Sequence, residues 1–237
     1  MNLLLLSAED FCAPGLVRIS GRRHRHLLDI LRTGPGQQVR AGLLNGKLGS
    51  AQIVAQTPEQ TTLSVALTEP SPAPAPLTLL LALPRPKVFR RLLQGITTFG
   101  IKRIVLLNTA RVDKSYWQSP FLAQDALLEQ LLLGLEQARD TILPEVLLCP
   151  RFRPFVEDLL PQLAADTLRL VAHPASSQPC PGAVADAVTL VIGPEGGFVP
   201  FEVELLTAQG FTAVHLGARP LRVETAVSAL LGRLLRL

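Results

Sequence analysis

The stretch that decides the fold is VTLVIGPEGGF, residues 188–198, in which an apolar run ends in a glycine-rich loop. The run is short enough to be a buried strand. In two other segments a strand-like run also ends in a loop with unusual residues, TLRLVAHPASS (167–177) and AVHLGARPLRVETA (213–226). Buried strands that alternate with helices form parallel sheets, so the pattern predicts an α/β domain. Ligands of such sheets bind beyond the carboxyl ends of the strands, which makes the three loops a candidate site.

A proline-rich stretch, EPSPAPAP (69–76), divides the chain into two predicted domains, residues 1–70 and 71–237. Alternating proline excludes a helix or a central strand and indicates an extended linker. In the second domain we expect strands and helices to alternate. The further elements expected there are strands at 77–84 and 103–108 and helices at 87–100, 120–139 and 225–237.

The first domain is predicted to be a small β-barrel with one helix. The helical pattern RRHRHLLDILR (22–32) ends at GPG (34–36). Three strand-like runs follow, at 37–44, 47–55 and 61–69, and Asn45-Gly46 between the first two is a strong hairpin signal. The opening MNLLLLSAEDF has no positively charged leader region and is interpreted as a first strand.

Composition limits the classes of protein that the chain can belong to. The 237 residues are 48% hydrophobic and 18% charged, with a formal net charge of +4, which permits an anionic partner without requiring one. Three widely separated cysteines argue against a disulfide framework or a zinc site. No apolar stretch approaches the length of a membrane span, so we expect a cytoplasmic protein with no membrane partner.

The glycine-rich loop is open to two interpretations. Gly193, Gly196 and Gly197 allow backbone N–H groups to approach a ligand closely, and no phosphate-loop lysine follows them. The alternative is a plain glycine turn. Glu195 between the glycines favours a binding loop, because a simple turn gains nothing from it.

Polar residues at the start of the last helix, LRVETA (221–226), also have two interpretations. Glu224 is favourable at the positive end of a helix, and Thr225 can act as a cap. Arg222 opposes the helix dipole at this position, which suggests an external anion or a functional site.

A basic cluster in the first domain is the candidate nucleic-acid interface. Solvation of one helix face explains such a cluster as well as contacts to phosphates do, and composition favours neither. We predict no metal site at His24 and His26. The predicted RNA-contacting residues are Arg18, Arg22, Arg23, Arg25 and Arg32.

The order IGPEGGF, LG and LRVETA resembles the ribosomal small-subunit methyltransferase E family of SPOUT-class methyltransferases. HLLDILRTGPGQ (26–37), Glu136-Gln137, LPEV (143–146) and AHPASS (172–177) extend the resemblance over most of the chain. It implies an N-terminal PUA-like barrel that binds RNA and a C-terminal SPOUT domain with a trefoil knot. It also implies a homodimer, S-adenosylmethionine as cofactor, and methylation of N3 of a uridine in small-subunit (16S) ribosomal RNA.

The resemblance carries over to individual positions. It implies Arg222 and Glu224 as catalytic residues. The cofactor-binding residues that it implies are Ala172, His173, Gly193, Glu195, Gly196, Gly197, Leu216, Gly217, Leu221, Arg222, Glu224, Thr225 and Ala226.

Three departures from the family pattern lie outside the three loops. The first strand lacks the usual preceding arginines, Asp140 takes the place of an arginine, and the helix at 87–100 ends in TTFG instead of ELG. Three other functions stay open: a non-catalytic RNA-binding ribosome assembly factor, a nucleotide-binding enzyme of the ordinary doubly wound type, and a SPOUT methyltransferase that acts on a different rRNA or tRNA position. The second is disfavoured because no phosphate-loop signature follows the first strand of the second domain.

Overall fold

The computed structural model describes residues 2–236 and separates into two compact units. The N-terminal unit comprises Met1–Ala73 together with Leu132–Leu143, and the C-terminal unit comprises Pro74–Leu131 together with Pro144–Leu237. The first boundary falls inside the proline-rich stretch. The sequence did not predict that residues 132–143 belong to the N-terminal unit. No helix in the described part of the chain is both long and apolar enough to cross a membrane.

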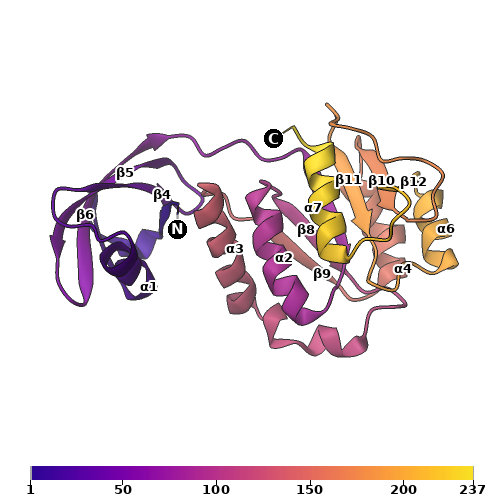
Figure 1. Cartoon of the computed structure of the whole chain (residues 1–237), viewed down its shortest axis with the longest axis horizontal. Coiled ribbons are helices and arrows are strands. Elements are labelled where there is room, and N and C mark those ends of the chain that lie inside the picture. Colours follow the sequence, from indigo (N-terminus) through magenta and orange to yellow (C-terminus); the bar gives the residue numbers. More distant parts are fainter. Residues whose placement is uncertain (1, 237) are drawn as a thin grey trace. The chain divides into compact units, whose positions relative to one another are not determined.

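The C-terminal unit is built on a six-stranded sheet in which all neighbouring strands are parallel (Figure 1), as predicted. The strand order is β12-β10-β11-β7-β8-β9. The strands are β7 (Leu77–Ala82), β8 (Arg103–Leu107), β9 (Glu145–Cys149), β10 (Leu168–Ala172), β11 (Val188–Ile192) and β12 (Thr212–Val214). β9 was not predicted from the sequence, because it lies at the edge of the sheet and none of its residues is fully buried.

Helices cover this sheet. Two of them, α2 and α7, pack side by side (Figure 1). α2 buries Phe89, Leu92, Leu93 and Ile96, and Gly100 beyond its end has a left-handed φ of +78°. The helices are α2 (Pro86–Thr98), α3 (Gln124–Ala138), α4 (Phe152–Pro154), α5 (Leu160–Leu163), α6 (Pro200–Ala208) and α7 (Val223–Leu234), with short helical turns η3 (Lys114–Gln118), η4 (Pro120–Leu122) and η5 (Phe155–Leu159).

The N-terminal unit contains a second six-stranded sheet, of order β1-β4-β5-β6-β3-β2. β1 and β4 are parallel and the other pairs are antiparallel. The elements are β1 (Leu4–Leu6), η1 (Ala8–Asp10), β2 (Phe11–Ala13), β3 (Leu16–Ser20), α1 (Gly21–Arg25), the π-helical turn η2 (His26–Ile30), β4 (Gln38–Leu43), β5 (Leu48–Gln56) and β6 (Gln60–Glu69). The predicted hairpin is confirmed, and Asn45 in its turn has a φ of +57°.

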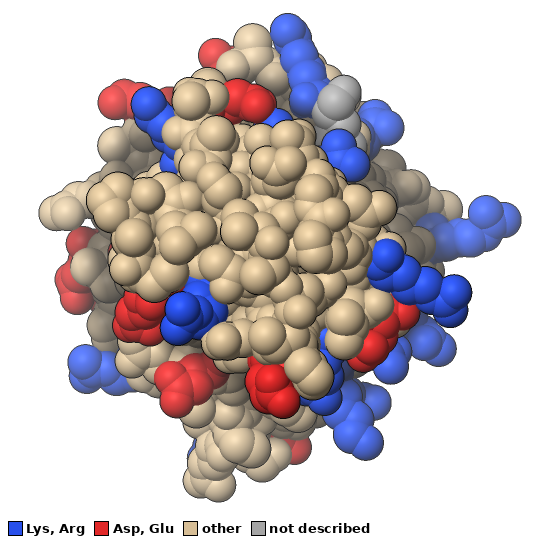
Figure 2. All heavy atoms as spheres, turned by 90° about the vertical axis from the view of Figure 1, so that its left-hand side faces the viewer, with Lys and Arg blue, Asp and Glu red and all other residues tan. Residues whose placement is uncertain are grey.

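One core holds this second sheet together. Leu4 of β1, Val17 of β3 and Ile53 of β5 share a buried cluster with Leu27 of the helical turn. Phe11 of β2, the strand at the other end of the sheet, packs against the same cluster. Strands from both ends of the sheet therefore meet in one core, so the sheet curls around it. Figure 2 shows that the centre of one face of this unit carries few charged side chains.

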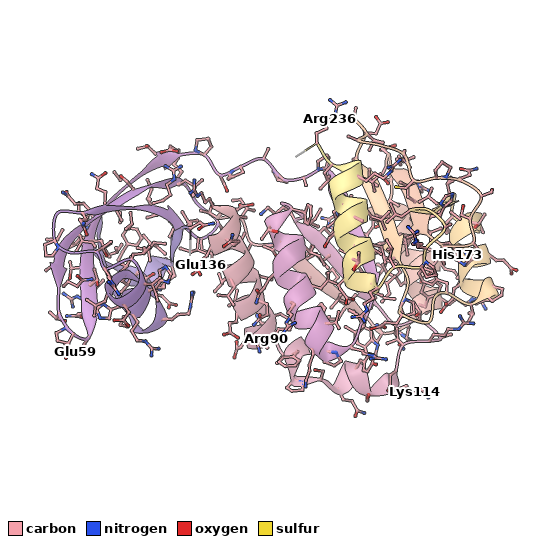
Figure 3. All side chains as sticks on the ribbon, in the orientation of Figure 1. Glu59, Arg90, Lys114, Glu136, His173 and Arg236 are labelled. Atoms are coloured by element: carbon pink, nitrogen blue, oxygen red, sulfur yellow. The ribbon has the colours of Figure 1, made fainter. Side chains whose placement is uncertain are left out.

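The end of α3 completes the N-terminal unit. Leu135 is fully buried with Leu3, Leu5 and Leu48. The side chain of Glu136 (Figure 3) is only 4% exposed and accepts two hydrogen bonds from Arg22, at 2.8 and 2.6 Å. A buried carboxylate is costly without a partner, so this bidentate pair holds the helix end in place.

Candidate active site

Three strand ends lie in one row across the C-terminal sheet. Ala172 at the end of β10 is in register with Ile192 at the end of β11 and with Val214 at the end of β12. The three loops singled out in the sequence therefore begin side by side. Parallel strands produce this arrangement, because their carboxyl ends share one edge of the sheet.

A cavity of about 250 Å³ lies between these loops and α7. Most of the predicted cofactor-binding residues line it. These are Ala172, His173, Gly193, Glu195, Gly196, Gly197, Leu216, Gly217, Leu221 and Ala226. The structure thus brings together residues that are up to 54 positions apart (226 − 172).

Other lining residues were missed from the sequence. Most are neighbours of predicted positions, such as Phe198, His215 and Arg219. Leu230 lies one helical turn beyond Ala226, so helical periodicity offered a signal for it. The remaining lining residues are Pro174, Ile192, Pro194, Val214, Pro220 and Val223.

Close packing shapes the glycine-rich loop. A Cβ atom on Gly193 would come within 3.0 Å of the Phe198 ring, and Phe198 is buried in the core. Gly197 has a φ of +73°, and its N–H donates to the carbonyl of Pro194 at 2.8 Å. The Arg111 guanidinium donates to the carbonyl of Gly196, and its stem lies where a Cβ of Gly196 would point. These glycines fit a tight loop with its backbone exposed to the cavity.

Two carboxylates fix this loop to its surroundings. Glu195 accepts a hydrogen bond from the backbone N–H of Arg85 at 3.2 Å. Glu202, which is 3% exposed, accepts from the N–H groups of Ala110 at 2.7 Å and Val199 at 3.0 Å. Glu202 therefore ties the start of α6 to the segment that follows β8.

Backbone hydrogen bonds also join the first and third loops. His215 donates its N–H to the carbonyl of Gln178 at 2.9 Å and accepts from the N–H of Cys180 at 2.8 Å. Its Nδ1 accepts from the N–H of Gly217 at 2.9 Å. Gly217 has a φ of +117°, which side-chain-bearing residues rarely adopt, so this turn requires glycine.

Arg222, Glu224 and Thr225 are not among the residues that line the cavity. Arg222 is the exposed N-cap of α7, and its carbonyl accepts from the N–H of Ala226 at 2.8 Å. Glu224 is half-buried in the first turn. Both residues are chain neighbours of Val223, which does line the cavity.

The basic cluster of the N-terminal unit divides into two groups. Arg22 is paired with Glu136, and Arg23 donates two hydrogen bonds to Asp10 at 2.6 and 2.7 Å. Burial acts to raise the pKa of Asp10, but bonds from Arg23 and Ser7 outweigh it and lower that pKa. Both arginines therefore form ion pairs that stabilise the N-terminal unit. The exposed residues Arg18, Arg25 and Arg32 have no side-chain hydrogen bond or ion pair with any residue in 2–236.

His24 also has a structural role. It is 2% exposed, with Nδ1 2.8 Å from the Thr61 hydroxyl and Nε2 3.0 Å from the Pro58 carbonyl. Across residues 2–236, no three histidine, cysteine or acidic side chains are grouped so that they could hold a metal ion.

Known proteins are similar to this chain in sequence. Residues 71–235 match the model of the RNA methyltransferase domain. The ribosomal RNA small subunit methyltransferase E of Treponema pallidum is 32% identical over 97% of this chain and 88% of its own length. Methyltransferase E 1 of Borreliella burgdorferi is 23% identical over 97% and 95%.

Solved structures share the fold. A Legionella pneumophila protein described as a methyltransferase, in complex with bound S-adenosylmethionine, has a TM-score of 0.75 and 27% identity over 97% of this chain and 95% of its own. The small subunit methyltransferase E of Neisseria gonorrhoeae also has a TM-score of 0.75, at 21% identity over 98% and 95%. The fold is that of an α/β RNA methyltransferase. The chain belongs to the ribosomal RNA small subunit methyltransferase E family.

Proposed function

We propose that this chain transfers a methyl group from S-adenosylmethionine to N3 of a uridine in small-subunit (16S) ribosomal RNA. The observation that carries the proposal is the cavity formed where the loops after β10, β11 and β12 meet α7. Membership in the family supports RNA as the substrate, and the Legionella structure supports the cofactor.

The residues of the cavity fit S-adenosylmethionine. Glu195 and Arg219 offer opposite charges to its ammonium and carboxylate, and Ile192 and Leu230 offer apolar contacts to its ring. The N–H groups of Gly193 and Leu216 have no hydrogen-bond acceptor within residues 2–236, so they are available to a ligand. With mostly apolar walls and a few polar groups, the site matches the usual character of small-molecule pockets.

We assign the catalytic roles to Arg222 and Glu224. Uridine N3 carries a proton at neutral pH and is a poor nucleophile until that proton leaves. Glu224 is the candidate base or orienting group, and Arg222 is the candidate cation that stabilises negative charge on O2 or O4 of the base. The cofactor, when bound, supplies an activated methyl group on its sulfonium.

For the N-terminal unit we propose a PUA-like RNA-binding role through Arg18, Arg25 and Arg32. The curled sheet and the exposure of these side chains support it. For the C-terminal unit we propose a trefoil knot. Hydrogen bonds of the segment 178–184 with both His215 and the end of α7 support it, since Val184 donates to the carbonyl of Leu234 at 3.2 Å. Action on ribosomal RNA further implies a cytoplasmic location.

A homodimer is proposed on the resemblance alone. The apolar face of α7 is not evidence for it, because Val223, Val227, Leu230, Leu231 and Leu234 are buried within the chain itself. Light scattering at micromolar concentration is expected to give twice the mass of the 25.6 kDa chain. A mass near that of one chain would contradict the dimer.

Nucleoside mass spectrometry tests the proposed reaction. Small-subunit RNA from a strain that lacks the gene is expected to have lost one N3-methyluridine, and incubation with purified protein and S-adenosylmethionine is expected to restore it. A different methylated nucleoside would overturn the uridine-N3 assignment. An unchanged nucleoside profile would favour a non-catalytic assembly factor.

A further inference from the structure

Six exposed cations gather outside the predicted interface, on the C-terminal unit. We call them the α2 basic surface: Arg85, Lys87, Arg90 and Arg91 at the start of α2, and Arg111 and Lys114 in the segment after β8. None of them was singled out in the sequence. Arg90 and Lys114 are labelled in Figure 3, on α2 and on the loop below the sheet.

Two contacts place Arg85 and Arg111 beside the candidate active site, and a third joins their two segments. The N–H of Arg85 donates to Glu195, and the Arg111 guanidinium donates to the carbonyl of Gly196. The Arg90 guanidinium lies over the Phe121 ring, 5.9 Å from its centroid. Arg111 and Phe121 belong to the same segment, which therefore runs from the glycine-rich loop to the exposed face of α2. The basic surface thus borders the cavity.

None of the six cations forms a salt bridge with a residue in 2–236, although Asp113 lies between Arg111 and Lys114 in the sequence. The side chains of Arg85, Lys87, Arg91 and Lys114 make no hydrogen bond or ion pair with any described residue. By contrast, Arg40, Arg103 and Arg153 are each paired with a glutamate. The first turn of α2 also has no acidic residue, so Arg85 and Lys87 oppose the helix dipole. A bound anion would reduce the repulsion among the unpaired cations. It would also reduce the repulsion between these cations and the positive end of the helix dipole.

The neighbouring side chains favour a nucleic acid as that anion. Tyr116 and Trp117 are partly exposed in η3, the same short helix that begins with Lys114. Basic side chains beside aromatic rings bind single-stranded RNA through phosphate contacts and base stacking. A lipid surface would need large apolar side chains, and none of the described exposed large hydrophobic residues lies between positions 85 and 118.

We propose that the α2 basic surface binds the sugar-phosphate backbone of the substrate RNA next to the target nucleotide, with Tyr116 and Trp117 stacking on its bases. The proposal rests on the proposed function, because it assumes an RNA substrate. It adds a contact surface within the methyltransferase unit itself, separate from the arginines of the N-terminal unit.

The test compares two triple variants that remove the same charge. Lys87→Gln/Arg91→Gln/Lys114→Gln changes the α2 basic surface, and Lys47→Gln/Arg151→Gln/Arg236→Gln changes three other exposed cations. Affinity for a fluorescent single-stranded 20-mer of small-subunit ribosomal RNA is measured against salt concentration. Each lost phosphate contact lowers the slope by about 0.7, so the first variant is expected to lose about two units and the second none.

Different results of this test would overturn the α2 basic surface and the proposed function. Both variants are expected to bind S-adenosylmethionine like the parent in calorimetry, since none of the substituted residues lines the cavity. A parental salt slope in the first variant, or an equal loss in the second, would overturn the α2 basic surface alone. Tighter binding of the parent to phosphatidylserine vesicles than to RNA would assign the surface to a membrane and overturn the proposal. A parent that binds the cofactor but no RNA would overturn the proposed function as well.

A single substitution replaces the triple variant in the test if the triple variant misfolds. If Lys87→Gln/Arg91→Gln/Lys114→Gln fails to bind the cofactor, Lys114→Gln alone is measured in its place. The expected loss of slope is then about 0.7 units, and an unchanged slope contradicts the proposal.

Discussion

Replacing Glu224 with glutamine is expected to leave a folded protein that binds S-adenosylmethionine and RNA but methylates roughly 10²- to 10⁴-fold more slowly, the usual contribution of a general base. Glutamine keeps the size of the side chain and cannot accept a proton at neutral pH. Glu224 lies in the first turn of α7, beside Val223 in the cavity wall. Single-turnover methylation of RNA, with the cofactor saturating, measures the effect on the chemical step.

A second role for Glu224 predicts a different outcome. A carboxylate near a helix N-terminus stabilises the helix by about 0.3–1 kcal/mol, and the loss of that contact alone would leave turnover largely intact. Asp125 provides the matched control, because it is an exposed acid in the first turn of α3. Asp125→Asn is expected to cost similar stability and to methylate like the parent. If Glu224→Gln also keeps near-parental single-turnover rates, Glu224 takes no part in the chemistry.

Replacing Gly217 with valine is expected to abolish the thermal stabilisation by S-adenosylmethionine. At 100 times its dissociation constant, a ligand adds about 2.7 kcal/mol to the free energy of unfolding, which raises the melting temperature by roughly 5–10 °C in a chain of this size. Valine cannot adopt the φ of +117° at this position without strain, so the third loop must move. Because Gly217 lines the cavity, that movement changes the binding site.

Gly210→Val is the matched control for this substitution. Gly210 also has a positive φ, of +79°, but it follows α6 and does not line the cavity. The Gly210→Val variant is expected to have a lower melting temperature without ligand. S-adenosylmethionine is still expected to raise that temperature by the same amount as in the parent. An equal shift in the Gly217 variant would mean that the third loop is not a wall of the cofactor site.

The residues of the cavity could be predicted because the relevant signals are local. A short apolar run followed by glycines indicates a strand that ends in a loop, and parallel pairing then places the ends of such strands together. Within the loops, single residues such as Gly217 can be recognised from the sequence without knowledge of distant segments. His215 and Arg219 were missed, since their contribution depends on how the third loop turns between Val214 and α7.

Long-range pairs could not be predicted in the same way. Arg22 and Glu136 are 114 positions apart, and nothing in either segment marks the other as its partner. The sequence of an arginine cluster does not reveal whether the side chains bind phosphates of a ligand or carboxylates of the protein itself. For that reason the sequence alone grouped Arg22 and Arg23 with the exposed arginines. The cations of the α2 basic surface were overlooked because they are spread over two segments of the chain.

The inclusion of residues 132–143 in the N-terminal unit affects how the chain folds during its synthesis. The first 73 residues leave the ribosome well before Leu135 and Glu136, which complete their core and pair with Arg22. Leu3, Leu5 and Leu48 can therefore be buried against Leu135 only after the segment beyond the proline-rich stretch has been synthesised. A chain cut at those prolines would separate Leu135 and Glu136 from the rest of the N-terminal unit, whereas the C-terminal unit lies wholly after the cut.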